Sequence, residues 1–490
     1  MSDPREPLRR IAVVGGGQLA VLAAIALRRS LPVTQVVLIG QPPSPASFSD
    51  WSTTALPFTN KLHDRLGVEE RDIVLKAGGS YRLVTRYSGW GSDGAPDGTL
   101  SFGEVLDPAL KTAFARDWGG GVRDTGGGPR AGSLAEVLAD AGRFAPPPPN
   151  EATPISGIDY ALRWNPAAYR DLLVGHAQQL QVQYVAGAVE AVEPDGDGGI
   201  VSLAVAGQGR IEADLFVDCS GPAATLLASS PAFRNVDWSA SLPTRTVYIG
   251  QTGAPVIALE DRLTLGLTGW TAQVAGRDGL YTVFGAGEGT AREDALTALG
   301  MPASAAIALS PGRAAQPWIG NVVALGDAAS RFEPLGPYHL DLAHRQLDLL
   351  LEMLPGRVIE PLERAEYNRR SVLMMEGVHE ILAAHFASAR GRTIFGEWAL
   401  PGRMAEVIDQ FERRGRIPFR EESPLLAQEQ FALLVALGFT PGLPPAARHA
   451  DESGEAQAKA LFAAECEAAL DFAPPYDRWL VSVLKPGSAG

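Results

Sequence analysis

The feature that most constrains this 490-residue chain is an uncharged stretch close to its N-terminus. Residues 11–27 carry no charged side chain, and arginine pairs flank them at 9–10 and 28–29. Three consecutive glycines at 15–17 interrupt the stretch, which is also shorter than the roughly 20 residues that a membrane-spanning helix needs. We therefore predict a buried strand before the glycines, a tight turn, and a helix over 18–27, with no membrane association.

The glycine turn has the spacing of a dinucleotide-binding site. A second apolar run, Gln35–Ile39, follows the predicted helix, and this strand-turn-helix-strand order is typical of a doubly wound nucleotide-binding fold. Gly15 permits the tight turn, Gly17 lets the backbone approach a pyrophosphate, and the small Ala20 lets helix and strand pack closely. The N–H groups that begin a helix favour phosphate. We predict that Gly15, Gly17 and Ala20 bind a dinucleotide, and a structural turn without a ligand is the alternative.

One part of the usual dinucleotide fingerprint is missing. An acidic residue is expected about 20 residues after the glycines, where it holds a ribose hydroxyl. Gly40 and Gln41 stand there instead. The ribose contact is therefore weaker or comes from another part of the chain.

Charge and cysteine content exclude several other classes. The chain has 42 Lys and Arg against 56 Asp and Glu, a formal net charge of −14, which argues against binding to a nucleic-acid backbone. Two cysteines cannot form a disulfide scaffold, and Cys219, after an apolar run, is expected to pack as a small hydrophobic residue. The histidines lack the i, i+4 spacing of a metal site, so we expect no metal. We expect a cytoplasmic protein.

Further elements follow from apolar periodicity and turn residues. A helix is predicted over 165–179. A long loop rich in glycine and proline is predicted over 88–150. Strands are predicted at 182–185, 200–205, 213–221 and 321–325, and C-terminal helices at 340–354, 364–386, 405–413, 429–437 and 456–470.

A second cofactor motif follows the strand predicted at 321–325. Gly326 and Asp327 are followed by two alanines and then by Pro334 and Gly336 ahead of a helix. This arrangement resembles the second flavin motif of aromatic-hydroxylase-type flavoproteins. The resemblance implies that Asp327 accepts a hydrogen bond from the ribityl chain and that the next helix directs its N-terminus at the flavin ring, where its dipole favours negative charge. Together with the glycine turn, the motif favours FAD over NAD.

These elements predict an α/β fold. It comprises an FAD-binding, Rossmann-like domain of the aromatic-hydroxylase type, a substrate domain, and a helical C-terminal region. The predicted boundaries are 8–60, 155–225 and 312–355 for the FAD-binding domain, 61–154 and 226–311 for the substrate-side sheet and loops, and 356–490 for the helical region.

The chain resembles the flavin-dependent tryptophan halogenase family almost from end to end. In that family a separate flavin reductase supplies reduced FAD, which reacts with O2 and then oxidises a halide. Hypohalous acid reaches an indole, where a lysine activates it and a glutamate assists the attack on the ring. The resemblance implies the same fold, FAD, a flavin reductase partner and a small aromatic substrate. The similar segments are 66–68, 80–82, 89–90, 160–173, 213–221, 312–313, 318–321, 333–335, 367–369, 384–386 and 473–476.

At the catalytic positions the chain departs from the family pattern. The family's lysine follows Ser and Tyr, and here that triplet ends in Arg82. The family's Glu-Pro-Leu-Glu segment reads Glu333-Pro-Leu-Gly336, which places Gly336 at the catalytic carboxylate and Glu333 at the family's first glutamate. The alignment then puts Tyr338 and His339 over the halide and flavin contacts.

The same alignment suggests which residues face the substrate. Of the aromatic residues that the family places around the indole, Phe102 is kept and Leu100 replaces a histidine. Arg82 either has a functional role, in which it anchors a substrate carboxylate or stabilises a flavin hydroperoxide, or is the structural partner of an acidic neighbour, since arginine suits anion pairing in each role. Tyr338 and His339 are candidates for acid-base chemistry.

We therefore expect a divergent FAD-dependent oxidoreductase of the tryptophan halogenase or aromatic monooxygenase type, acting on a small aromatic substrate, and not a standard halogenase. The alternative is a non-catalytic, halogenase-like protein that binds a nucleotide or a partner. An NAD-dependent dehydrogenase is a weaker third reading. A homodimer is left open.

Overall fold

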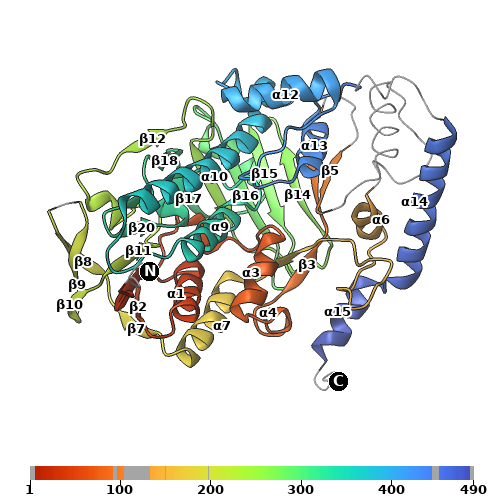
Figure 1. Ribbon diagram of the computed structural model, residues 1–490. Coiled ribbons are helices and arrows are strands. Elements are labelled where there is room, and N and C mark those ends of the chain that lie inside the picture. Colours follow the sequence, from red (N-terminus) through yellow and green to blue (C-terminus); the bar gives the residue numbers. More distant parts are fainter. Residues whose placement is uncertain are drawn as a thin grey trace. The chain divides into compact units, whose positions relative to one another are not determined.

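The computed structural model of the chain describes residues 6–91, 97–103, 133–148, 150–196, 198–443 and 452–485. They form two compact units, and Figure 1 labels many of their elements. Unit 1 comprises residues 1–79, 163–248 and 304–379, and unit 2 comprises residues 80–162, 249–303 and 380–490. The three-part division into domains stays a prediction.

Unit 1 is built on a six-stranded sheet with the order β19-β20-β11-β1-β2-β7. All neighbouring pairs are parallel except β19 with β20. The apolar strands β11 and β20 are buried along their whole length, as expected for parallel strands covered on both faces. The strands are β1 (Arg10–Val14), β2 (Gln35–Gly40), β7 (Gln183–Ala186), β11 (Leu215–Asp218), β19 (Trp318–Ile319) and β20 (Val322–Ala324).

Helices pack around this sheet. The first ten residues of α1 (Gln18–Ser30) are all buried, because α1 lies against α7 (Pro166–Gln179) and α9 (Tyr338–Glu352). Asn165 accepts a hydrogen bond from the Ala168 amide and so caps α7. The predicted strand, glycine turn and helix at the start of the chain are confirmed. The remaining helices that begin in unit 1 are α2 (Phe48–Trp51), α3 (Phe58–Leu66), α4 (Glu70–Lys76) and α10 (Pro361–Ala387).

Two three-stranded sheets complete unit 1, with the orders β10-β9-β8 and β12-β18-β21. The chain crosses between the units within β6 (Ala161–Arg163), β13 (Thr246–Gly250), β17 (Ala303–Ala308) and α10. The small elements of unit 1 are β8 (Val189–Pro194), β9 (Ile200–Val205), β10 (Gly209–Glu212), β12 (Asn235–Asp237), β18 (Gly312–Ala314), β21 (Ser330–Arg331) and the 3-10 turns η2 (Leu227–Ser229) and η3 (Gly326–Ala328).

Unit 2 contains neighbouring strands in the order β16-β15-β14-β4-β5. Its strands are β3 (Ser80–Arg82), β4 (Val84–Ser88), β5 (Gly98–Ser101), β14 (Glu260–Leu265), β15 (Gly269–Val274) and β16 (Tyr281–Ala286). Its helices are α6 (Leu134–Asp140), α8 (Arg292–Leu299), α11 (Ala389–Phe395), α12 (Gly402–Arg414), α13 (Ala427–Ala436), α14 (Glu452–Phe472) and α15 (Tyr476–Leu484). The predicted C-terminal helices are confirmed as α9, α10, α12, α13 and α14, whereas the sequence missed α11 and α15.

The prediction of a long loop insertion or substrate-side excursion over 88–150 overlooked two regular elements. The segment contains β5, which pairs with β4, and α6. The Ser133 side chain accepts from the Glu136 amide and starts α6, and Ala135 and Leu138 are fully buried. The glycines and prolines on either side obscured both elements. Residues 92–96, 104–132 and 149 lie outside the described residues.

Within the part of the chain that the structure describes, no helix is both long and apolar enough to cross a bilayer.

Candidate functional site

The glycine turn between β1 and α1 has the close approaches that its residue types require. Gly15 has φ +150°, and a Cβ on it would lie 2.5 Å from the Cys219 carbonyl oxygen and 2.9 Å from the Ala20 Cβ. Only glycine at 15 and a small residue at 20 fit there. The turn therefore has the geometry that the sequence predicted for Gly15 and Ala20.

The N-terminus of α1 is covered by a carboxylate of the same chain. Asp50, on the short helix α2, is only 6 % exposed, and its Oδ1 accepts a hydrogen bond from the Leu19 amide at 3.3 Å. A Cβ on Gly17 would lie 2.0 Å from the Oδ1 of Asp50. A carboxyl group thus occupies the place where the sequence predicts a pyrophosphate, and its oxygen accepts from an amide at the start of α1 as a phosphate oxygen would.

Asp327 is also bound to α2. It follows β20 in the turn η3, and its two carboxylate oxygens accept from the Phe48 amide at 3.1 Å and the Ser49 amide at 2.7 Å. Gly326, at φ +60°, allows the turn, and a Cβ on it would lie 2.8 Å from the Ser49 Oγ. The structure therefore brings both predicted cofactor motifs to one region of unit 1, with α2 in contact with each.

A glutamine side chain holds α2 in this position. The Gln18 amide nitrogen donates to the carbonyl oxygens of Ser49, Asp50 and Ser52 at 2.9, 3.2 and 2.8 Å. The Gln18 side-chain oxygen in turn accepts from the Trp164 indole at 2.9 Å. Sequence reasoning missed Gln18 and Asp50, because their contacts depend on a segment with no recognisable motif.

The electrostatics of this region centre on Asp50. Burial, and then the neighbouring Asp327, raise the pKa of Asp50 to about 7. The hydrogen bonds from the Leu19 amide and the Ser47 side chain, and the charge of Arg170, act in the opposite direction. Arg170 also donates to the Gly16 carbonyl oxygen. Two buried carboxyl groups close together cannot both be ionised without cost.

In this conformation the region does not fit the expected FAD. Asp50 fills the space at the α1 N-terminus where a pyrophosphate would bind and accepts from the Leu19 amide, and the Phe48 and Ser49 amides already donate to the two oxygens of Asp327 that a ribityl hydroxyl would use. Two buried hydroxyl oxygens, Ser49 Oγ and Ser330 Oγ, have no hydrogen-bond partner among the described residues. Polar groups that could bind a ligand are therefore present, but α2 occupies both the α1 N-terminus and the carboxylate of Asp327.

The segment before α9 and the first turn of α9 contain the other predicted flavin and acid-base residues. Pro334 is half-buried, and Gly336 has φ +96°. Tyr338 begins α9 and is buried. His339 stacks on the Phe332 ring at 3.9 Å between centroids, and its Nε2 lies 3.0 Å from the Phe332 carbonyl oxygen. Burial lowers the pKa of His339 to about 4, so its contacts are those of a neutral, packed imidazole.

Glu333 is the residue of this segment that the sequence did not select. Its side chain is fully buried, and neither carboxyl oxygen has a hydrogen-bond partner among the described residues. Burial raises its pKa to about 8, and the backbone amide of Glu333 itself and the charge of Arg245 act in the opposite direction. The only sequence signal was its position as the family's first glutamate. A buried carboxyl group that keeps its proton at neutral pH is suited to donating a hydrogen bond or a proton.

Arg82 forms a buried ion pair in unit 2. Its Nη1 lies 3.2 Å from the Oδ2 of Asp261 on β14, and both side chains are at most 4 % exposed. The guanidinium carbon is 5.0 Å from the centroid of the Phe102 ring. Leu100, also buried, pairs with Thr85 across β4 and β5. The ion pair with Asp261 matches the structural interpretation of Arg82, in which the arginine is the partner of an acidic neighbour.

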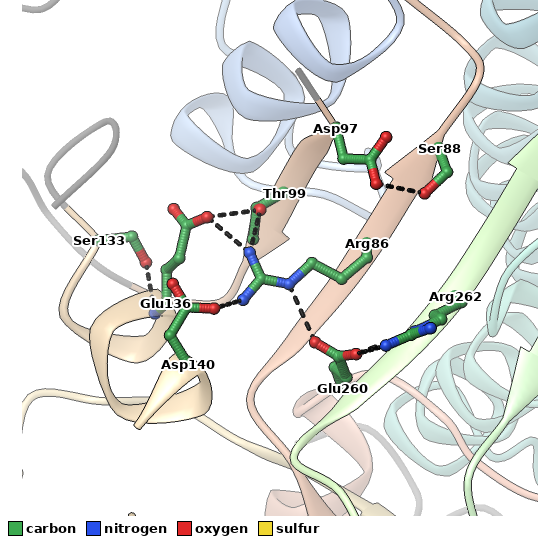
Figure 2. A network of polar contacts seen from close by, with 9 residues as sticks. All are labelled: Arg86, Ser88, Asp97, Thr99, Ser133, Glu136, Asp140, Glu260 and Arg262. Carbon is green, nitrogen blue, oxygen red and sulfur yellow. Dashed lines mark hydrogen bonds and ion pairs between the residues drawn. The ribbon is translucent and has the colours of Figure 1, made fainter. Parts of the chain in front are cut away.

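A second arginine of unit 2 organises a larger polar network, shown in Figure 2. Arg86 on β4 contacts Glu136 and Asp140 of α6, Thr99 of β5 and Glu260 of β14. The distance from its Nη1 to Glu136 Oε1 is 2.6 Å, and burial raises the pKa of that carboxyl. These contacts fix α6 to the sheet and are consistent with a structural role.

Comparison with known proteins identifies the relatives of this fold. The family model described as "Tryptophan halogenase" matches residues 10–452. Tryptophan 7-halogenase RebH of Lentzea aerocolonigenes is 25 % identical over 440 residues, covering 82 % of this chain and 81 % of RebH. Tryptophan 6-halogenase SttH of Streptomyces toxytricini is 25 % identical over 451 residues, covering 82 % and 84 %.

Solved structures show the same fold. Xcc4156, a flavin-dependent halogenase from Xanthomonas campestris, superposes with a TM-score of 0.86 at 22 % identity and covers 98 % of this chain and 99 % of its own. BrvH, a flavin-dependent halogenase from Brevundimonas sp. BAL3, has a TM-score of 0.85 at 22 % identity, with 97 % and 99 % covered. The predicted α/β fold with a helical C-terminal region is confirmed.

Proposed function

Because the chain belongs to the tryptophan halogenase family, we propose that it is an FAD-dependent oxidoreductase of the halogenase and aromatic-monooxygenase type. We propose a small aromatic, tryptophan-like substrate and a separate flavin reductase as the source of reduced cofactor. The observation that carries the proposal is the meeting of the glycine turn after β1 and Asp327 after β20 in unit 1. In doubly wound sheets this carboxyl edge is where dinucleotides bind.

The residues proposed to hold FAD are those of the two motifs. Gly15, Gly17 and Ala20 would admit the pyrophosphate to the α1 N-terminus, and Asp327 would accept from ribityl or ribose hydroxyls. Pro334 and Gly336 would shape the approach to α9. FAD supplies the redox chemistry in this family, and the protein positions it.

The reaction is proposed to differ from standard halogenation. The Arg82 guanidinium is permanently charged and paired with Asp261, so it is poorly suited to the role of a lysine that activates hypohalous acid. Gly336 offers no carboxylate, and Glu333 is the buried carboxyl group of the same segment. Phe102 and Leu100 are proposed to face the substrate, and Tyr338 and His339 remain candidates for acid-base chemistry.

The test is FAD binding followed by turnover. The purified chain is expected to take up FAD with a rise in Tm, since a ligand that binds only the folded state stabilises it. Reduced FAD, supplied by a flavin reductase with O2, is then offered with and without halide to a panel of indoles and phenols. Oxygenated product without halide supports the proposal, whereas efficient halogenation contradicts the claim of non-standard chemistry.

A non-catalytic protein is the second candidate, and one observation favours it. Helix α2 engages both cofactor motifs in the structure, through Asp50 at α1 and through the amides on Asp327. If the chain binds FAD but yields no product with any substrate of the panel, the second candidate is favoured. Substrate-dependent product eliminates it.

A further inference from the structure

Helix α2 is positioned like a ligand of its own chain. One carboxylate, that of Asp50, covers the α1 N-terminus, while two amides at the start of α2 engage Asp327. A dinucleotide presents the same two kinds of group, namely an anionic pyrophosphate and hydroxyl donors. The four residues of α2 therefore imitate both halves of the proposed cofactor contact.

We propose that Asp50 is an intramolecular competitor of the dinucleotide pyrophosphate, so that cofactor binding requires α2 to leave the α1 N-terminus. The inference rests on the proposed function, because the displaced contacts belong to the proposed FAD site. In the present arrangement the space beside Gly17 is filled, since the Oδ1 of Asp50 lies 2.0 Å from the position of a Cβ on Gly17. The Asp50 carboxyl group accepts from the Leu19 amide, one of the α1 N-terminal donors that a pyrophosphate would use.

Displacement of α2 has identifiable costs within unit 1. It breaks the hydrogen bonds from the Phe48 and Ser49 amides to Asp327, and those from the Gln18 side chain to three backbone carbonyls. The cofactor replaces the partners of Asp327 and of the α1 amides. The cofactor does not replace the Gln18 hydrogen bonds, so their loss raises the free energy of the open arrangement.

Opening of α2 is coupled to the release of a proton from Asp50. The charged and titratable groups that face Asp50 are Asp327 from η3, Arg170 from α7 and Cys219 after β11. Burial and Asp327 raise the pKa of Asp50 to about 7 in the closed arrangement, and exposure to water returns this pKa toward its ordinary value of 3.8. Closed α2 therefore binds a proton that open α2 releases.

The sign of the pH dependence follows from this difference. Because the pKa of Asp50 is raised in the closed arrangement, the closed arrangement has its full extra stability below about pH 4. This stability is lost as the pH rises through about 7. Opening, and with it FAD binding, becomes easier over the same window. Affinity for FAD is expected to increase by up to about tenfold per pH unit between about pH 4 and 7, and to level off above.

The experiment measures FAD binding to the full chain without any turnover. Titration of FAD fluorescence gives Kd near pH 5.5 and pH 7.5, and calorimetry in two buffers of different ionisation enthalpy gives the protons released. Wild type is compared with Asp50→Asn, which keeps the Leu19 contact but cannot ionise, and with Asp50→Ala, which uncovers the α1 amides. Asp64→Asn, an exposed carboxylate on α3, is the matched control.

The variants have distinct expected results. Wild type and Asp64→Asn should bind FAD at least about tenfold more tightly at pH 7.5 than at pH 5.5 and release about one proton per FAD near pH 6. Asp50→Asn and Asp50→Ala should show neither effect, and Asp50→Ala should bind more tightly than wild type at pH 5.5. Hydrogen exchange of the amides in 44–54 should become faster when FAD binds wild type, because Asp327 exchanges partners.

Each contrary result has its own meaning. If wild type binds FAD equally at both pH values with no proton release, the competition by Asp50 is refuted while the FAD-dependent function stands. If Asp50→Ala binds FAD and wild type does not, the competition is supported and the proposed function of the natural chain fails. If no variant binds FAD, both ideas are wrong.

Discussion

Replacing Arg82 with methionine tests whether this arginine stabilises the fold or serves a substrate. Methionine keeps much of the side-chain volume against Phe102 but leaves the carboxylate of Asp261 buried without the positive charge at 3.2 Å. Removing one member of a buried ion pair costs about 3–5 kcal/mol. With about 2–4 °C per kcal/mol for a unit of this size, the Tm should fall by roughly 6 °C or more.

The assay is a double-mutant cycle followed by thermal unfolding. Asp261→Asn alone leaves the guanidinium buried without its counter-charge and should also destabilise the chain. The double variant Arg82→Met, Asp261→Asn has neither buried charge and should recover most of the loss, with a coupling energy of about 2 kcal/mol or more. Lys485→Met, an exposed side chain near the C-terminus, controls for the loss of a positive charge.

The reasoning is refuted by a specific pattern. Arg82→Met with an unchanged Tm, together with weaker binding of an indole or phenol substrate, would mean that the ion pair contributes no stability and that Arg82 acts on the substrate. A double variant no more stable than either single variant would also contradict the assignment, since the two charges would then be independent.

Three further changes test other parts of the structure. Gly336→Ala should lower the free energy of unfolding by about 1–3 kcal/mol, because φ is +96° and the new Cβ would lie 2.8 Å from the Tyr338 ring. The control Gly402→Ala, in open space at the start of α12, should have little effect on the Tm. Glu333→Gln should unfold at a higher temperature than wild type at about pH 9 and at the same temperature at about pH 4. The raised pKa of Glu333, about 8 in the folded chain, stabilises the folded state at low pH, and this stabilisation is lost as the pH rises through about 8. Arg86→Ala should lower the free energy of unfolding by about 2 kcal/mol and speed hydrogen exchange of the α6 amides. Unchanged exchange in α6 would show that the network of Figure 2 does not hold the helix in place.

Some of the fold could be predicted because the signals are local. The uncharged run and its three glycines specify β1, the turn and α1, since strand burial and the backbone freedom of glycine depend on neighbouring residues. The C-terminal helices followed from apolar spacing in the same way. Helix α6 was missed because its capping serine and buried leucine lie in a segment whose glycines and prolines indicate a loop.

The candidate site was predictable only in part. The sequence selected Gly15, Gly17 and Asp327 as candidates, and the parallel order of β1, β11 and β20 explains why the structure brings them to one region. It gave no indication that Asp50 lies over the α1 N-terminus or that Gln18 holds α2. These contacts join segments that carry no motif.

By itself, the sequence determined the family, the α/β class and two motifs that we propose bind the cofactor, because residue type and spacing specify turns, buried strands and amphipathic helices. Only the tertiary structure decided the state of the charges: Asp50 against α1, Asp327 against the α2 amides, Arg82 against Asp261. The energy of a buried charge depends on the groups that the fold brings within a few ångströms and on the water it excludes. Neither quantity is recorded in the order of neighbouring residues.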